Sequence, residues 1–416
     1  MSADTIILAA ATLIGLYMAA NIGANDLANA MGTSVGSRAL TLKQAVVISI
    51  VANLLGAILA GGHVTNTIRK GMINPELLAG SPQLLMMGMF AALLAAGIWV
   101  HLATVFGLPV STTHSIVGAV VGFGLVSVGA GAISWGTVIT IVLSWVVSPI
   151  AGAIIAGAIY SLVRNKILRS ETPEKMAMRW SPYLIGAVLV VIVLSFIFKG
   201  LKNLHLDLGL TQAIAIAVPC AAAGGLLGRL WLNYLLRRDL QHQEQTTAPL
   251  QSFFAHLQVM TACYVAFAHG ANDVANAIGP LAAIFSVVKT GSVAMQIEVP
   301  VWMLAVGGIA VGGGLFAFGS RVMETIGGKI TEVTPVRGFC AEFGAATTIL
   351  VCSRLGLPVS TTHVLVGAVV GVGFMRGMGF LDMRLLRNIA SSWIITLPFT
   401  MVLAIVLYKL LTLFFL

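Results

Sequence analysis

The sequence predicts an all-α polytopic membrane protein made of two inverted-topology repeats, with broken helices and two re-entrant helical hairpins. Of its 416 residues, 58% are hydrophobic and only 9% are charged, against about 25% charged in an ordinary soluble domain. The longest apolar stretches exceed the roughly 20 residues that cross a bilayer as a helix. Because these stretches are continuously apolar and do not alternate, helices are predicted in preference to barrel strands.

Two motifs occur twice at nearly the same spacing. The segment GANDLANAMG at 23–32 returns as GANDVANAIG at 270–279, and GLPVSTTHSIV at 107–117 returns as GLPVSTTHVLV at 356–366. The offsets of 247 and 249 residues agree, so one half of the chain is a copy of the other. Duplicated apolar halves with polar breaks at matching places are typical of secondary transporters, whose site lies where the repeats meet.

Each continuous apolar run is expected to form a helix. In chain order the expected helices are 5–37, 44–62, 84–106, 109–128, 132–163, 182–198, 209–235, 251–290, 299–319, 338–355, 358–378 and 385–414. The first follows a start without basic residues and is interpreted as a retained helix, not as a cleaved signal. The polar stretches 164–181 and 237–251 are expected to be short cytoplasmic loops. This divides the chain into a first inverted repeat at 1–164, linking helices and loops at 165–250, and a second inverted repeat at 251–416.

Two of the expected helix pairs are interrupted by glycine and proline. Gly107 and Pro109 break the pair 84–128, and Gly356 and Pro358 break the pair 338–378. We expect the first helix of each pair to end at glycine and the second to carry proline in its first turn. Each pair is predicted to be a hairpin that enters and leaves the membrane on one side.

The net charge of +9 is spread between the apolar runs, which indicates a membrane surface and not a nucleic-acid partner. With the N-terminus outside, fifteen basic residues fall on the cytoplasmic side and six outside, which obeys the positive-inside rule. This orientation places both termini outside the plasma membrane, or the inner membrane of a bacterial cell. The first GAND helix then runs inward and the second outward, so the repeats are predicted to be inverted.

Both GAND motifs place an acid and amides inside apolar sequence. An ionised carboxylate at the bilayer centre costs about 2.5 to 3.5 kcal/mol on insertion scales, so it needs a partner or a water-filled cavity. Asp at position i and Asn at i+3 share a helix face, and the preceding Gly23 and Gly270 are expected to let the backbone open and free carbonyl groups. Such oxygens suit Na⁺, and a carboxylate can also carry H⁺. The alternative is that the amides only join helices by hydrogen bonds. The candidate ligands of the coupling ion are Asn25, Asp26, Asn29, Asn272, Asp273 and Asn276, of which Asp26, Asn29, Asp273 and Asn276 are the candidates for Na⁺.

Three consecutive hydroxyl residues follow the proline of each hairpin. The start of a helix exposes free NH groups at the positive end of its dipole, which favours an anion. Two such starts, one from each half, are expected to meet near the midplane and hold one tetrahedral oxyanion. The alternative is N-capping alone. The candidate anion-binding residues are Ser111, Thr112, Thr113, Ser360, Thr361 and Thr362.

Three further polar residues have more than one interpretation. His114 and His363 are candidates to bind the ligand, to relay a proton, or only to satisfy a carbonyl group in a packed hairpin. Glu342 has no acidic counterpart in the first half, and it is a candidate ion ligand or proton-coupled gate. The four cysteines lack CxxC spacing and are interpreted as small core residues. The chain contains no GxxxxGK[ST] loop for ATP and no HExxH zinc helix.

The paired GANDxAN and PVSTTH motifs, with Trp145 and Pro149 answered by Trp393 and Pro398, resemble the inorganic phosphate transporter (PiT) family over nearly the whole chain. The resemblance implies a symporter of inverted repeats that is driven by Na⁺ or H⁺ and needs no cofactor. It implies that Asp26, Asn29, Asp273 and Asn276 serve the coupling cations and the ligand, and that the two Ser-Thr-Thr runs bind phosphate. The long hydrophilic central loop of animal members is absent, so regulation through such a loop is not expected.

The expected function is therefore phosphate uptake by symport with Na⁺ or H⁺, with alternating access around a midplane site. A sulfate permease of the same fold is the first alternative, and an anion channel is the second. An intramembrane hydrolase using Asp26 and Asp273 as an aspartic pair, or Ser111 with His114, is a third. Hydrolysis needs one asymmetric arrangement, whereas this chain keeps both copies of each motif, so no enzyme is expected. The expected partners are phosphate, the coupling cation and the lipid bilayer, and a homodimer is a candidate assembly.

Overall fold

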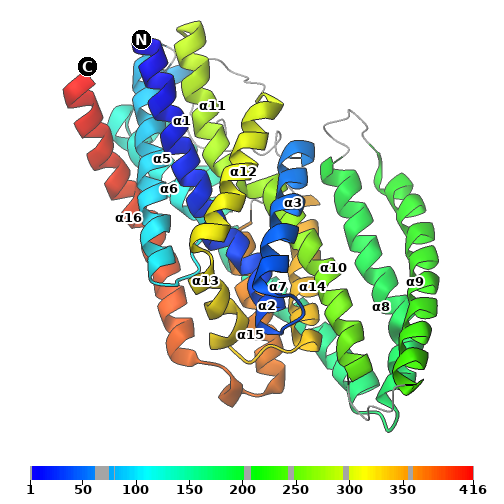
Figure 1. Ribbon diagram of the computed structural model, residues 1–416. Coiled ribbons are helices and arrows are strands. Elements are labelled where there is room, and N and C mark those ends of the chain that lie inside the picture. Colours follow the sequence, from blue (N-terminus) through cyan, green and yellow to red (C-terminus); the bar gives the residue numbers. More distant parts are fainter. Residues whose placement is uncertain are drawn as a thin grey trace.

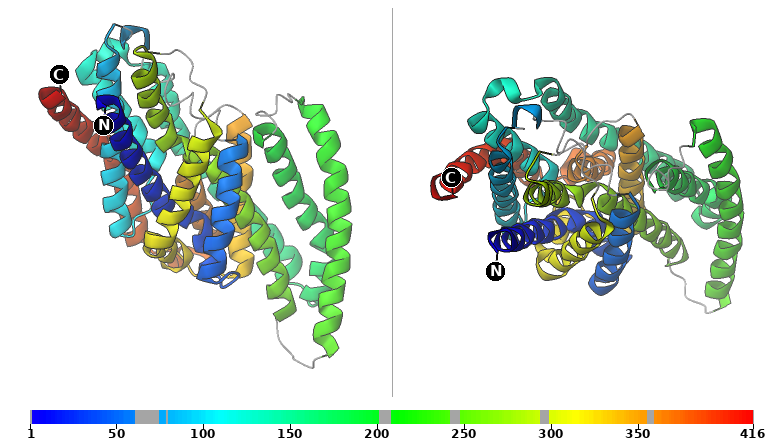
Figure 2. Two further views of the ribbon diagram at one scale, coloured as in Figure 1. Left: turned by 45° about the horizontal axis from the view of Figure 1, so that its top comes forward. Right: turned by 90° about the horizontal axis from the view of Figure 1, so that it is seen from above.

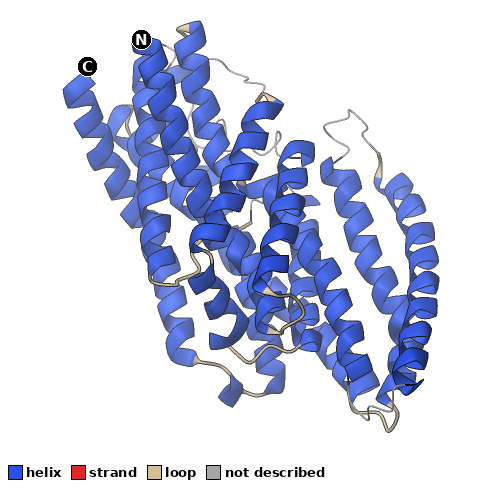
Figure 3. Ribbon diagram, in the orientation of Figure 1, coloured by secondary structure: helices blue, strands red, loops and turns tan. Residues whose placement is uncertain are grey.

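The computed structural model describes residues 2–60, 75–78, 80–200, 208–241, 248–293, 299–354 and 359–415. The regular structure within these ranges is helical, and Figure 3 shows no strand among them. Nine helices of the described part are long and apolar enough to cross a membrane. The predicted all-α polytopic fold is confirmed.

The first half contains both broken elements that the motifs predict. Its helices are α1 (Ala3–Ile22), η1 (Gly23–Leu27), α2 (Ala28–Gly36), α3 (Leu42–Ala60), α5 (Pro82–Val105), α6 (Thr112–Ser127) and α7 (Trp135–Val163), with short turns η2 (Pro75–Leu78), η3 (Ala130–Ala132) and η4 (Arg164–Leu168). The GAND motif is a π-helical turn, η1, inside one continuous helical rod. A π turn widens the helix locally and is common at functional sites.

The second half repeats this order. After the linking helices α8 (Pro173–Ser195), η5 (Phe196–Gly200) and α9 (Leu210–Gln241), it contains α10 (Ala248–Asp273), α11 (Ala275–Thr290), α12 (Val301–Phe318), α13 (Ser320–Glu324), η7 (Thr325–Lys329), α14 (Pro335–Arg354), α15 (Thr361–Arg376), η8 (Met378–Phe380) and α16 (Met383–Phe415). The second GAND motif breaks its helix at Val274, between α10 and α11. Both motifs therefore interrupt regular α-helix at the same place.

The two halves run in opposite directions where their motifs lie. In Figure 1 both termini lie at one end of the molecule; the rod α1–η1–α2 runs away from that end, and α10–α11 runs towards it. Figure 2 shows α8 and α9 at one side of the bundle, away from the termini. The antiparallel course supports the inverted relation of the repeats, which stays a prediction, as do the three domain boundaries.

Two expected boundaries are wrong. Helix α8 begins at Pro173, where proline occupies the first turn, so most of the expected loop 164–181 is helical. The polar residues at the start of this helix conceal it from a search for apolar runs. Pro109 lies before α6 and not in its first turn, because Ser111 is the N-cap. Its counterpart Pro358, with Gly356, lies outside the described residues.

The glycines of the GAND motifs do not open the backbone in the expected way. Gly23 keeps α-helical angles of −63° and −43°. A Cβ atom on Gly23 would lie 1.7 Å from the carbonyl oxygen of Val311, and one on Gly270 would lie 1.9 Å from that of Asn53. Both glycines therefore allow close helix packing, and the π turn and the break at Val274 provide the irregular backbone.

The contact between α1 and α12 gives a test of this packing. Gly314 faces α1, and a Cβ there would lie 1.7 Å from the carbonyl oxygen of Ala20, whereas a Cβ on the adjacent Gly313 has no atom within 4 Å. Gly314→Ala is expected to lower the free energy of unfolding by about 1–3 kcal/mol or more, because backbone must move. Gly313→Ala is the matched control and is expected to leave it nearly unchanged. Thermal unfolding of the two purified variants in one detergent measures the difference; equal midpoints would contradict the close approach.

Candidate functional site

Each hairpin brings a capped helix start into the interior. In the first hairpin Gly107, with φ of 66°, makes the turn that leads from α5 to α6. The Ser111 hydroxyl accepts a hydrogen bond from the NH of His114 (3.2 Å), and the Ser360 hydroxyl accepts one from the NH of His363 (3.3 Å). Both serines are therefore N-caps. The threonines that follow them are free to turn their hydroxyl groups towards the GAND motifs.

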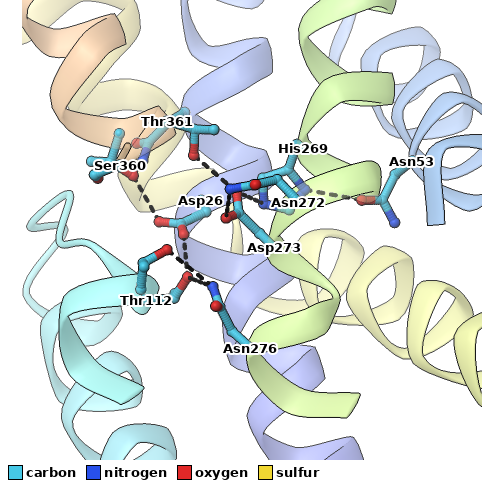
Figure 4. Close-up of polar contacts among 12 residues, drawn as sticks. Asp26, Asn53, Thr112, His269, Asn272, Asp273, Asn276, Ser360 and Thr361 are labelled. Carbon is cyan, nitrogen blue, oxygen red and sulfur yellow. Dashed lines mark hydrogen bonds and ion pairs between the residues drawn. The ribbon is translucent and has the colours of Figure 1, made fainter. Parts of the chain in front are cut away.

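Asp26 is contacted by both hairpins at once. Its carboxylate is buried in η1 and accepts a hydrogen bond from the hydroxyl of Thr112 at 2.5 Å and from that of Thr362 at 2.8 Å. These threonines belong to α6 and α15, which lie in different halves of the chain. The carboxylate thus joins the two helix starts that were expected to meet, as the close-up in Figure 4 shows for Thr112.

The amides of the two motifs reach across the halves in a reciprocal way. Asn29, from the first motif, donates to the hydroxyl of Thr362 in the second hairpin at 2.9 Å. Asn276, from the second motif, donates to the hydroxyls of Thr112 (3.1 Å) and Thr113 (3.2 Å) in the first hairpin. Each hairpin start is therefore bound by the GAND helix of the opposite half, and the two motifs build one shared site.

Asp273 has a different set of partners. It accepts hydrogen bonds from the hydroxyl of Thr361 (2.9 Å) and the amide of Asn272 (3.0 Å), and its Oδ2 lies 3.5 Å from Nε2 of His269. Nδ1 of His269 lies 2.9 Å from Oδ1 of Asn53. If Nδ1 carries the proton and donates it to Asn53, Nε2 faces the carboxylate with a lone pair. A cation or a proton shared by these two atoms would satisfy both.

His269 and Asn53 were missed by the sequence analysis. The available signal was the spacing of His269 and Asp273, which are four residues apart and so share a helix face. One ligand atom each from Asp26, His269 and Asp273 lies within 4.8 Å of the others. No lysine or arginine is among the described side chains that contact either carboxylate. Two carboxylates that lie this close without a fixed positive charge are chemically suited to bind cations.

The two histidines of the STTH runs lie between paired aromatic rings. His114 stacks on Trp145, with ring centroids 3.3 Å apart, and His363 stacks on Trp393 at 3.7 Å. The two imidazoles meet edge to face at 4.3 Å. They therefore join the hairpins behind the threonines, and no contact in the described part links either ring to Asp26 or Asp273. Nδ1 of His363 lies 3.4 Å from the carbonyl oxygen of Trp145, as the packing interpretation expects, whereas neither ring nitrogen of His114 has a partner among the described residues. The three interpretations of His114 therefore stay open.

Asn25 lies outside the shared site. Its amide donates to the hydroxyl of Thr104 and to the carbonyl of Leu108, and its oxygen accepts from the NH of Val110, all at 3.0 Å. These bonds hold the turn of the first hairpin against η1. A direct role of Asn25 as an ion ligand stays a prediction that these contacts do not support.

Glu342 forms a second buried polar centre beside α2. Its Oε1 accepts hydrogen bonds from the hydroxyls of Thr33 (2.6 Å) and Ser34 (2.8 Å) and from the amide of Gln258 (3.2 Å), and its Oε2 accepts from the hydroxyl of Thr261 (2.7 Å). The side chain is fully buried, and all four of these donors are neutral. Thr33 and Ser34 lie one turn beyond Asn29 along the same helix, so this centre is next to the shared site and separate from it.

A substitution separates the charge of Glu342 from its hydrogen bonding. A buried carboxylate costs more than an amide of the same shape, so we expect the charge of Glu342 to have a function. We expect Glu342→Gln to keep its unfolding midpoint and to lose about tenfold or more of the phosphate uptake that the sequence resemblance implies, which is at least about 1.4 kcal/mol. Glu342→Leu is expected to lose stability as well, because four donors lose their acceptor. Full uptake by the Gln variant would mean that Glu342 has a structural role only and that its charge is not needed.

Comparison with known proteins places these residues in a described family. The family model described as the phosphate transporter family matches residues 22–404 of this chain. A relative from Pyrococcus abyssi whose name describes it as a phosphate permease is 45% identical over 399 residues, which cover 96% of each chain. The inorganic phosphate transporter 2-1 of Arabidopsis thaliana, named as chloroplastic, is 42% identical over 437 residues, covering 98% of this chain and 72% of that one.

A solved structure described as the sodium-dependent phosphate transporter has a similar fold. It superposes with a TM-score of 0.87 and 41% sequence identity, and the match covers 98% of this chain and 99% of that one. The similarity therefore extends through both repeats and the linking helices.

Proposed function

This chain belongs to the phosphate transporter family, and we propose that it takes up inorganic phosphate by symport with Na⁺, with alternating access around the shared site. Members of this family are transporters, so the chain is a multi-pass membrane protein and not an enzyme, and the hydrolase alternative is set aside. The observation that carries the proposal is the carboxylate of Asp26, which hydroxyl groups from both hairpins contact at the same time.

The proposed order of binding follows from the charges. Phosphate is an anion, and Asp26 and Asp273 would repel it at short range in a medium of low dielectric constant. Cations therefore bind first at the two carboxylates, with Asn29 and Asn276 beside them. Phosphate then binds between the first turns of α6 and α15. The threonine hydroxyls that donate to Asp26 in the structure turn to the anion once a cation compensates that carboxylate. The loaded site becomes accessible from the other side when one bundle moves against the other.

Na⁺ is proposed in preference to H⁺ as the coupling ion. The carboxylate, amide and hydroxyl oxygens that converge here are hard ligands, as Na⁺ requires. The related structure at 41% identity is described as sodium-dependent. A buried carboxylate can also carry H⁺, so the transport experiment below distinguishes proton coupling from Na⁺ coupling.

Phosphate is proposed in preference to sulfate. At neutral pH phosphate can still donate a hydrogen bond, whereas sulfate cannot. The carboxylate of Asp26 lies at the meeting point of both helix starts, where it can accept that bond. Membership of a phosphate transporter family agrees with this choice.

We place the protein in the plasma membrane, or in the inner membrane of a bacterial cell, with both termini outside. The two termini lie at the same end of the molecule in Figure 1. The excess of basic residues on the opposite side supports this orientation. A relative named as chloroplastic is 42% identical. Localisation of the tagged protein in cells therefore tests which membrane contains it.

Transport by the purified protein in liposomes tests the proposal. Radiolabelled phosphate is added outside, and an inward Na⁺ gradient or an inward proton gradient is imposed separately. The expected result is transient accumulation above equilibrium with the Na⁺ gradient, little with the proton gradient, and weak competition by sulfate. Accumulation driven by the proton gradient alone would replace Na⁺ by H⁺. Downhill flux without accumulation under either gradient would identify a channel.

A further inference from the structure

The linking helices form a groove that the transport site does not use. Helices α8 and α9 pack against each other, and a groove of about 1010 Å³ opens between them. Figure 2 shows this pair at the edge of the bundle, with α9 outermost. None of the residues that line the groove belongs to the shared site, so the two are separate.

Most of the groove is apolar. Tyr183, Val218 and Leu226 are among the residues that line it, and all three side chains are well exposed. Along the outer side of α9, Leu227 and Leu230 are also exposed, by 66% and 65%. Exposed apolar side chains on a membrane-spanning helix face acyl chains, so lipid reaches this groove from the side.

Three basic residues gather at one end of the groove. Gly225 packs on Pro182, and Gly186 packs on Ala221, so the two helices pair in antiparallel register. This register places Arg229 of α9 at the level of Arg179 of α8, with Lys175 one turn beyond, and all three line the groove. None of the three makes an ion pair with a described residue, and no acid lines the groove.

The other end of the groove is lined by Val190 and Val218. Val190 lies eleven residues after Arg179 in α8, which corresponds to about 16 Å of helix at 1.5 Å per residue and is about half the thickness of a hydrocarbon core. The groove thus has the length of one lipid leaflet, with positive charge at one end only.

We propose that this groove binds one anionic phospholipid. Its phosphate lies among Lys175, Arg179 and Arg229, and an acyl chain follows the apolar length between α8 and α9. Basic residues near a membrane surface attract anionic headgroups, and the apolar length selects a lipid over a soluble phosphate. A second copy of the chain is a poorer occupant, because a two-fold contact through this groove would bring six cations to the same level.

Native mass spectrometry of the delipidated full-length protein, titrated with phosphatidylglycerol, tests the proposal. Phosphatidylcholine with the same acyl chains is the comparison lipid. The triple variant Lys175→Gln, Arg179→Gln, Arg229→Gln removes the cluster. The matched control Lys43→Gln, Arg384→Gln, Arg387→Gln removes the same charge from exposed residues outside the groove. Ala222→Trp fills the groove without any change of charge.

The unaltered protein and the control variant are expected to bind phosphatidylglycerol about tenfold or more tightly than phosphatidylcholine, because three basic residues near the membrane surface attract the anionic headgroup. The triple variant is expected to lose this preference, and Ala222→Trp is expected to weaken binding of the first lipid. Equal loss in the control variant, or no preference in the unaltered protein, would overturn the proposal. A dimer that binds no lipid and is broken by Ala222→Trp would assign the groove to a second copy. If the triple variant does not fold, the proposal is still tested by the binding of the two lipids to the unaltered protein and to Ala222→Trp.

Discussion

Replacing Asp26 or Asp273 with Asn is expected to remove most of the Na⁺-driven phosphate uptake. Asn has nearly the shape of Asp. At position 26 its single carbonyl oxygen can accept from Thr112 or Thr362 while its NH2 group faces the other hydroxyl, and at position 273 it can accept from Thr361. It lacks the negative charge that compensates a cation in a buried site. The initial rate of uptake into liposomes under a Na⁺ gradient is expected to fall about a hundredfold, which corresponds to about 2.7 kcal/mol.

Asp382→Asn is the matched control for these variants. Asp382 is an exposed carboxylate whose side chain accepts a hydrogen bond from the NH of Leu385 at the start of α16. Asn is as good an N-cap as Asp, so stability and uptake are expected to be nearly unchanged. Uptake that stays Na⁺-driven in both Asp26→Asn and Asp273→Asn would contradict the proposed order, in which the cations bind to these carboxylates before phosphate.

The second large effect is expected from the threonines at the two helix starts. Thr112 and Thr362 each donate to Asp26 and each accept from an asparagine of the opposite half, namely Asn276 and Asn29. Valine keeps the shape of threonine and removes the hydroxyl. We expect Thr112→Val and Thr362→Val each to lower the initial rate about tenfold or more, because a donor to phosphate is lost and the amide of Asn276 or Asn29 loses an acceptor.

Thr348→Val is the control for this pair. Thr348 is also buried, but its hydroxyl donates only to the carbonyl of Gly344 in its own helix. Because Thr112 and Thr362 share Asp26, their effects are expected to be less than additive in the double variant. Strict additivity, or an equal loss in Thr348→Val, would mean that the two hairpins do not act on one carboxylate.

The sequence predicted the pairing of the two repeats but not the details of their contact. The repeated motifs indicated that Asp26 and the two Ser-Thr-Thr runs meet, and the structure brings them together. The spacing of Asp26 and Asn29 placed both on one helix face. Asn25 directly precedes Asp26, so the two side chains leave the helix in different directions, and Asn25 points to the hairpin turn.

Contacts between helices that are far apart in the sequence could not be predicted from the spacing of residues. Asn53 contacts His269 across 216 residues, and no pattern near either residue indicates that distance. The cluster around Glu342 in α14 likewise draws its donors from two other helices, α2 and α10. The start of α8 was missed because its first turns are polar, which is typical of a helix that projects beyond the apolar layer. Apolar runs define spans, and they do not define where helices end outside them.

One measurement tests the central claim, that the two halves form a single site for phosphate and its cations. Equilibrium binding of radiolabelled phosphate to the purified protein in detergent gives both the number of sites per chain and the dependence on Na⁺. The account predicts one phosphate per chain, with an affinity that rises steeply as Na⁺ replaces choline at constant ionic strength. Two phosphates per chain, or an affinity that does not respond to Na⁺, would contradict it.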